Sequence, residues 1–160
     1  MKINTLARAL AVSATVLLGA LGAGLSFTVQ AQATSSVKPL PNDSLYQQFG
    51  AKEGLTKLMA DFVERLYADP RTRPFFKDIE KTHLQAQLTD QLCEVSGGPC
   101  QLQGPSMKRV HDSLEIDKSS FNALVEVLQQ SMDAQGIPFA AQNRMLAQLA
   151  PMNRDIISKD

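Results

Sequence analysis

The sequence predicts an all-α domain, and three observations support this prediction. Apolar residues recur at three- and four-residue spacing in several stretches. No stretch alternates apolar and polar residues over the length of a strand. Glycine and proline fall between the periodic stretches, where helices end. The 160 residues are 44% apolar and carry 16 basic and 16 acidic side chains. This balance excludes a disordered chain and gives no basic excess for a nucleic-acid partner.

The N-terminal segment, residues 1–33, has the pattern of an export signal. Lys2 and Arg8 form a short positive start, and an uncharged, mostly apolar run follows over residues 9–29. Ala31-Gln32-Ala33 then supplies small residues at the two positions that a signal peptidase reads. We therefore expect a periplasmic or secreted protein. The alternative is an uncleaved membrane anchor, because the run approaches the ~20 residues that a spanning helix needs.

The expected cleavage site divides the chain into three parts. Cleavage is expected after Ala33, with cleavage after Ala31 as the variant. Residues 34–44 form a polar linker with two prolines. Residues 45–160 remain as one folding unit, whose length is normal for a single compact core.

The first half of this unit predicts two main helices. The first carries an amphipathic stripe of three turns and is stopped by Asp69-Pro70, because the residue before proline disfavours the helical region. Its stripe consists of Leu55, Leu58, Met59, Phe62, Val63, Leu66 and Tyr67. A short segment, Arg71–Phe76, follows. The second helix carries Leu84, Leu88, Leu92 and Val95, and Gly97-Gly98 ends it.

The second half predicts two more long helices after an irregular connection. A loop runs to about Pro105, and a short apolar segment then carries Met107, Val110, His111 and Leu114. Asp117 is the expected N-cap of the next helix, whose face is Phe121, Leu124, Val125, Leu128 and Met132. Gly136 ends that helix, and Pro138 suits the first turn of the last one. The last helix should bury Met145, Leu149, Met152 and Ile156.

The two cysteines allow two interpretations. Seven residues along a continuous helix would separate the Cα atoms of Cys93 and Cys100 by roughly 10 Å, whereas a disulfide needs less than about 7 Å. A bridge therefore requires the helix to end between them, and Gly97-Gly98-Pro99 is a place to end one. The alternative is two unpaired thiols. The spacing of cysteines and histidines does not fit a zinc site.

His111 needs more explanation than packing. It shares the apolar face of its short segment, and a buried neutral imidazole needs a hydrogen-bond partner or a metal. Periodicity alone favours a hydrogen-bonded core or boundary histidine over a ligand. The long connection from Gly97 to Asp117 is unusual in so small a domain, and such connections are usually functional.

At this point the sequence resembles a known family over essentially all of residues 45–157. The similarity is to group I truncated haemoglobins, small globins with a two-over-two helical sandwich. The landmarks, in order, are LYQQFG, DFVERLYADP, RPFF, SGGP, MKRVH, DKSSF and GIPFAAQNRMLAQLAPMNRDII. The resemblance implies a truncated globin-like two-over-two helical sandwich that holds haem.

The resemblance also implies a set of site residues. His111 in MKRVH matches the histidine that ligates the haem iron, and Phe76 matches the phenylalanine at the haem edge. Further wall residues are Met107, Val110, Phe121 and Leu124 on the proximal side, and Phe62, Val63, Leu84 and Leu88 on the distal side. Lys108 and Arg109 can pair with the haem propionates or form a solvated charged face. The sequence lacks Cys-x-x-Cys-His, so we expect haem b without covalent attachment.

The distal residues depart from the family pattern. Relatives of this group place a tyrosine where Val63 stands and a glutamine where Leu88 stands, next to the distal position Leu84. We therefore expect an apolar pocket that binds CO and NO well but holds O₂ briefly. Two residues could restore polarity. Tyr67 could lean inward rather than place its hydroxyl in water, and His83 could become a sixth iron ligand rather than face solvent at the rim beside Gln87.

Three functions compete at this stage. The first is an exported haem protein that reversibly binds a diatomic gas (O₂, NO or CO) to carry, scavenge, sense or transform it. The second is a periplasmic haem redox or peroxidase-like protein, which would need a reductase that the sequence does not name. The third is a haem-less globin-fold module that acts through protein contacts. No residue is assigned as catalytic, and enzymatic activity stays open.

Overall fold

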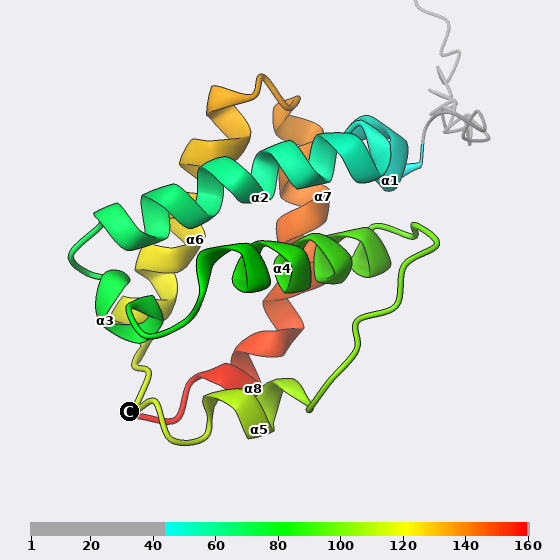
Figure 1. Cartoon of the computed structure of the whole chain (residues 1–160). Coiled ribbons are helices and arrows are strands. Elements are labelled where there is room, and N and C mark those ends of the chain that lie inside the picture. The colour runs from blue at the N-terminus through cyan, green and yellow to red at the C-terminus, as the bar shows by residue number, and fades with distance from the viewer. Residues whose placement is uncertain (1–43, 160) are drawn as a thin grey trace, which may run out of the picture. The chain divides into compact units, whose positions relative to one another are not determined.

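The computed structural model describes residues 44–159, which form helices joined by turns and loops (Figure 1). No strand occurs among these residues, as the all-α prediction requires. The expected signal peptide and nearly all of the expected linker lie outside the described residues. No helix within 44–159 has the length and apolar character needed to cross a membrane. The helices are α1 (Leu45–Gln48), α2 (Ala51–Ala68), α3 (Arg73–Phe76), α4 (Lys81–Val95), α5 (Met107–His111), α6 (Lys118–Ala134), α7 (Phe139–Leu149), the 3₁₀ helix η2 (Ala150–Met152) and α8 (Asn153–Ile156).

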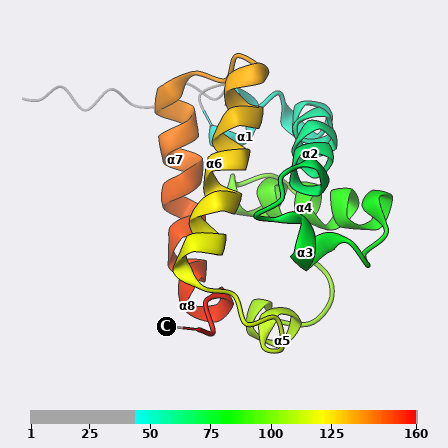
Figure 2. The ribbon, with the colours of Figure 1, turned by 90° about the vertical axis from the view of Figure 1, so that its left-hand side faces the viewer.

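The long helices form two layers, which Figure 2 shows from the side. Helices α2 and α4 pack against each other in one layer, and α6 and α7 form the second. Helix α2 also packs on α6, and α4 on α7, so the core lies between the layers. The predicted stripe of α2 is buried from Leu55 to Leu66, and Tyr67 is half-buried at its end.

Helix α6 buries a face that the apolar pattern did not predict. Leu128 and Met132 are buried as expected, but Phe121, Leu124 and Val125 are only half-buried. Ala123, Val127 and Ser131 are buried instead, at four-residue spacing. Alanine and serine add little to a hydrophobicity pattern, so a face built from small residues escapes it. The half-buried pair Phe121 and Leu124 is left at the end of α6 that lies nearest α5 (Figure 2).

The predicted last helix is broken into three pieces. Pro138 stands one residue before α7 and serves as its N-cap rather than lying inside its first turn. Helix α7 ends at Leu149, and Pro151 sits inside the 3₁₀ helix that follows. Proline lacks an N–H and its ring clashes with the carbonyl four residues earlier, so the α-helix cannot continue through it. The short helix α8 is thereby turned toward α5, which it contacts.

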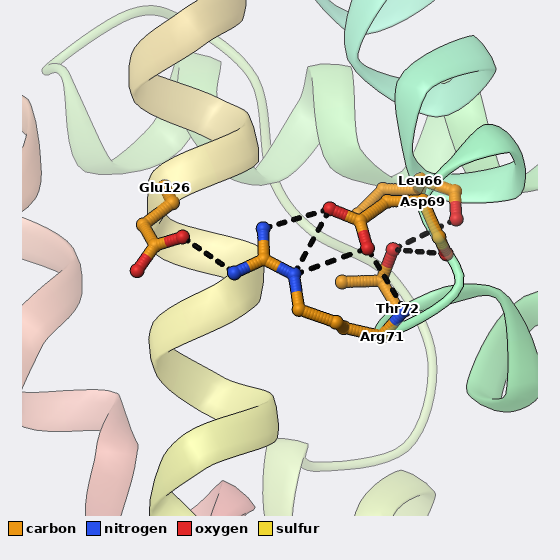
Figure 3. Close-up of polar contacts among 5 residues, drawn as sticks. All are labelled: Leu66, Asp69, Arg71, Thr72 and Glu126. Atoms are coloured by element: carbon orange, nitrogen blue, oxygen red, sulfur yellow. Dashed lines mark hydrogen bonds and ion pairs between the residues drawn. The ribbon is translucent and has the colours of Figure 1, made fainter.

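The corner after α2 is held by side chains from three elements (Figure 3). Arg71 forms ion pairs with Asp69 and, across to α6, with Glu126. Its guanidinium holds the pKa of the Asp69 carboxyl below the ordinary value. Thr72 is buried, and its hydroxyl donates to the Leu66 carbonyl at 2.8 Å. The corner sets the position of α3, which begins at the next residue and carries Phe76.

The end of α4 satisfies the condition for a disulfide. The helix stops at Val95, and Gly97 turns the chain back with a φ of +83°. The Cα atoms of Cys93 and Cys100 lie 5.6 Å apart, and the structure joins their sulfurs. Gly98 fits closely there, because a Cβ on it would come within 2.6 Å of the Tyr46 ring and 2.7 Å of the Cys93 sulfur.

Candidate functional site

The site residues come from α3, α4, α5 and α6. Helix α5 lies below α4 in Figure 1 and is connected to it by the long loop 96–106. Its N-cap is Ser106, whose hydroxyl accepts a hydrogen bond from the Arg109 backbone N–H. The N-cap of α6 is Asp117, as predicted, and its carboxylate accepts from the Ser120 N–H at 2.7 Å. Hydrogen bonds to backbone and side chain of Ser120 lower the pKa of the Asp117 carboxyl.

His111 is oriented by a hydrogen bond within its own helix. Its Nδ1 lies 2.7 Å from the Met107 carbonyl oxygen. A carbonyl can only accept, so Nδ1 must carry the proton, and in the neutral ring Nε2 keeps its lone pair. This is the arrangement in which a metal-ligating histidine is usually held, with one nitrogen on a backbone carbonyl and the other free for the metal. The half-buried imidazole therefore has Nε2 available to a metal.

Several of the predicted apolar site residues keep exposed surface. Phe76, Leu84, Leu88 and Leu124 lie at the margin of the core, packed against it but only partly buried. Met107 and Phe121 are half-buried, and Val110 is 46% exposed. The fully buried residues of α4 are Thr89, Leu92 and Cys93, all in its second half. The first half of α4 and the whole of α5 thus leave apolar surface uncovered, which suits a flat apolar cofactor.

The residues predicted for the distal side are apolar. Phe62 and Val63 are buried in α2, with exposures of 3% and 2%. Neither side chain can donate a hydrogen bond, and the same holds for Leu84 and Leu88. Tyr67 does not replace them, because its hydroxyl donates to the Ile79 carbonyl, and the Lys81 ammonium lies 5.0 Å from the centre of its ring. The hydroxyl is thus held by a backbone carbonyl at an exposed position. Burial raises the pKa of Tyr67.

The remaining predicted residues lie at the rim. His83 is exposed in the first turn of α4, where its backbone N–H donates to the Glu80 cap at 2.7 Å. Gln87 is half-buried one turn further along. Lys108 and Arg109 are exposed on α5. No cluster of three or more His, Cys, Asp or Glu side chains occurs within residues 44–159, so the described chain offers no all-protein metal site.

Sequence reasoning missed two groups that build the site. The Met107 carbonyl, which orients His111, carries no signal in a residue pattern because every residue has a carbonyl. Ser106 does carry a signal, since serine just before a short apolar segment is a favoured N-cap. Treating Ser106 as an N-cap would have placed the start of α5 at Met107.

Comparison with known proteins agrees with this geometry. The family model for bacterial-like globins matches residues 44–158. A group 1 truncated hemoglobin from Tetrahymena pyriformis is 25% identical over 116 residues, covering 72% of this chain and 96% of that protein. One from Mycolicibacterium paratuberculosis is 26% identical over 113 residues, covering 71% and 83%.

Solved structures show the same fold. The Fe(III) form of the Tetrahymena pyriformis protein superposes with a TM-score of 0.69 at 25% identity, covering 72% of this chain and 98% of that one. A 2/2 hemoglobin from Synechococcus, solved with covalently attached heme, gives a TM-score of 0.67 at 18% identity and covers 72% and 99%. The predicted two-over-two sandwich is confirmed, and the chain belongs to the bacterial-like globin family, as a truncated globin of group 1.

Proposed function

We propose that this globin holds haem b through His111 and reversibly binds a diatomic gas in an apolar pocket. The observation that carries the proposal is the His111 hydrogen bond to the Met107 carbonyl, which leaves Nε2 available to iron. A neutral imidazole is a normal axial ligand of haem. The group 1 relatives are named as hemoglobins.

The described residues fit such a cofactor. Phe76, Leu84, Leu88 and Leu124 would contact its apolar faces and edge. The exposed cations Lys108 and Arg109 would pair with its carboxylates near solvent. Ferrous haem, when bound, supplies the centre at which O₂, CO or NO binds.

The ligand preference follows from Val63, Leu84 and Leu88. Solved variants of the Tetrahymena pyriformis protein replace one tyrosine and two glutamines, with the tyrosine 21 residues before the first glutamine and the glutamines four residues apart. Val63, Leu84 and Leu88 have the same spacing in this chain. We infer that three apolar side chains stand where that protein has polar ones. O₂ depends on hydrogen-bond donors more than CO does, so this pocket should release O₂ quickly and retain CO.

Leu88→Gln tests this preference by restoring one donor. The haem-loaded wild type should show a strong Soret band whose ferrous form shifts with CO. Leu88→Gln should slow O₂ dissociation about tenfold or more, since a hydrogen bond to a charged partner contributes about 1.5–3 kcal/mol. Flash photolysis or stopped-flow mixing measures the rate.

Leu88→Met is the matched control, because it changes shape without adding a donor. Equal O₂ dissociation rates in Leu88→Gln and Leu88→Met would show that the lack of a donor at this position does not cause fast O₂ release.

The exposed His83 predicts a five-coordinate ferrous protein. A low-spin ferrous spectrum before gas is added, abolished by His83→Ala, would favour six-coordination instead.

We further propose that the protein is exported. The pattern of residues 1–33 supports this, and the pairing of Cys93 with Cys100 is consistent with an oxidising compartment. Residues 34–44 would then link the new N-terminus to the globin domain of residues 45–160.

N-terminal sequencing of the protein from the periplasm or medium of a producing cell tests export. The expected first residue is Thr34, or Gln32 if cleavage follows Ala31. Titration of thiols in the same sample under denaturing conditions should find none. A chain that starts at Met1 and stays in the membrane fraction would support an anchor.

A further inference from the structure

The segment that carries His111 is held at few points. Helix α5 has five residues and contacts α8, which has four. Beyond it, the Ile116 carbonyl accepts from the backbone N–H groups of Ser158 and Lys159. Before it, the Leu102 N–H donates to Glu94 at 2.9 Å. The disulfide between Cys93 and Cys100 adds a covalent cross-link between this loop and α4, beside the backbone connection at Ser96.

The two sulfurs of this disulfide have different surroundings. Cys93 is fully buried in the core. Cys100 is half-buried, and its sulfur lies 3.6 Å from the ammonium of Lys52, which also pairs with Asp90. An incoming thiol can reach Cys100 more easily than Cys93. A nearby ammonium stabilises a thiolate, so Lys52 favours Cys100 as the charged sulfur when the bridge is open.

We propose that the Cys93–Cys100 disulfide is a redox switch for haem retention, in which reduction loosens the loop before α5 and speeds haem release. The proposal rests on haem binding by His111. The reductant would be a protein or small-molecule dithiol. Its thiolate attacks the Cys100 sulfur, the S–S bond breaks, and Cys93 leaves and takes up a proton. The second thiol of the reductant then displaces Cys100 as a thiolate beside Lys52. Two electrons pass to the protein, and the reductant becomes a disulfide.

Reduction lengthens the free segment in front of His111. With the bridge closed, six residues, 101–106, separate the anchor from α5. With it open, the nearest backbone anchor is Gly98, whose N–H donates to the Cys93 carbonyl at 2.7 Å. The segment in front of α5 then has eight residues, 99–106, within which Leu102 keeps its hydrogen bond to Glu94. The added chain entropy is small, and we expect haem release to quicken about 1.5-fold.

The test measures haem transfer from the purified haem-loaded protein to an excess of an apoglobin acceptor, before and after treatment with dithiothreitol. Reduced wild type should release haem about 1.5-fold faster than oxidised wild type. Cys93→Ala/Cys100→Ala should release it at the faster rate with or without reductant. Reduction should also raise the rate of amide hydrogen exchange in residues 101–111, whereas the exchange rate in α2 should not change. Lys52→Met should keep the oxidised release rate but slow re-closure of the reduced bridge.

Several outcomes would overturn the proposal. Equal haem release and equal exchange in the oxidised and reduced proteins would show that the bridge does not control the loop. If dithiothreitol still speeds haem release from Cys93→Ala/Cys100→Ala, the reductant does not act through this disulfide. If neither form takes up haem, the proposed function itself fails. Normal haem uptake with unchanged exchange in residues 101–111 would reject the switch alone.

Discussion

Replacing His111 by alanine is expected to remove most of the haem from the protein. The imidazole is the described donor whose Nε2 is left free by a backbone hydrogen bond, and its neighbours on α5 are apolar or cationic. Losing an outer-sphere partner of a metal ligand already lowers affinity about 10–100-fold, so losing the ligand itself should exceed about 100-fold. A haem titration followed by Soret absorbance measures the change, and far-ultraviolet circular dichroism checks that the variant stays helical.

His83→Ala is the matched control for this experiment. His83 is the other histidine of the chain, and its side chain is exposed at the start of α4. Its loss should leave the haem affinity and the ferrous spectrum unchanged. The assignment of His111 would be wrong if His111→Ala kept the wild-type Soret band and CO shift. It would also be wrong if exogenous imidazole failed to restore haem binding to the variant.

Gly54→Ala is expected to destabilise the fold by about 3 kcal/mol, although alanine is the better helix former. The reason is a close approach between the start of α2 and the end of α1. A Cβ on Gly54 would lie 1.9 Å from the Phe49 carbonyl oxygen and 2.9 Å from its carbonyl carbon. The Phe49 side chain is 2% exposed in the core, so its backbone cannot move away without disturbing packing. Urea unfolding of the two proteins measures the difference in free energy.

Gly97→Ala separates this clash from the general effect of replacing a glycine. Gly97 has a φ of +83°, but a Cβ there would meet nothing within 4 Å. Its replacement should therefore show only the strain of a left-handed alanine, about 1–2 kcal/mol. A Gly54→Ala protein as stable as the wild type, or more stable, would mean that α1 and α2 are not packed at this distance.

Part of the candidate site could be predicted from the chain because its signals are local. The apolar spacing of α2 and the cap at Asp117 each depend on residues within a turn or two, and the structure places both as expected. The order of short motifs, through the family resemblance, identified His111 as the candidate ligand. It also predicted that Val63, Leu84 and Leu88 offer no hydrogen-bond donor to a bound gas. The hydroxyl of Tyr67 could not be placed in this way, because its partner is a backbone carbonyl at Ile79, twelve residues away.

The sequence by itself determined that this protein is helical and where α2, α4 and α6 end, and it singled out His111 as the candidate haem ligand. These properties follow from side-chain type and spacing along one segment. Tertiary structure alone decided the buried small-residue face of α6 and the backbone partner of the Tyr67 hydroxyl. It also decided how closely Gly54 and Phe49 approach. Each of these depends on backbone groups or on contacts between distant segments, and neither leaves a pattern in side-chain hydrophobicity.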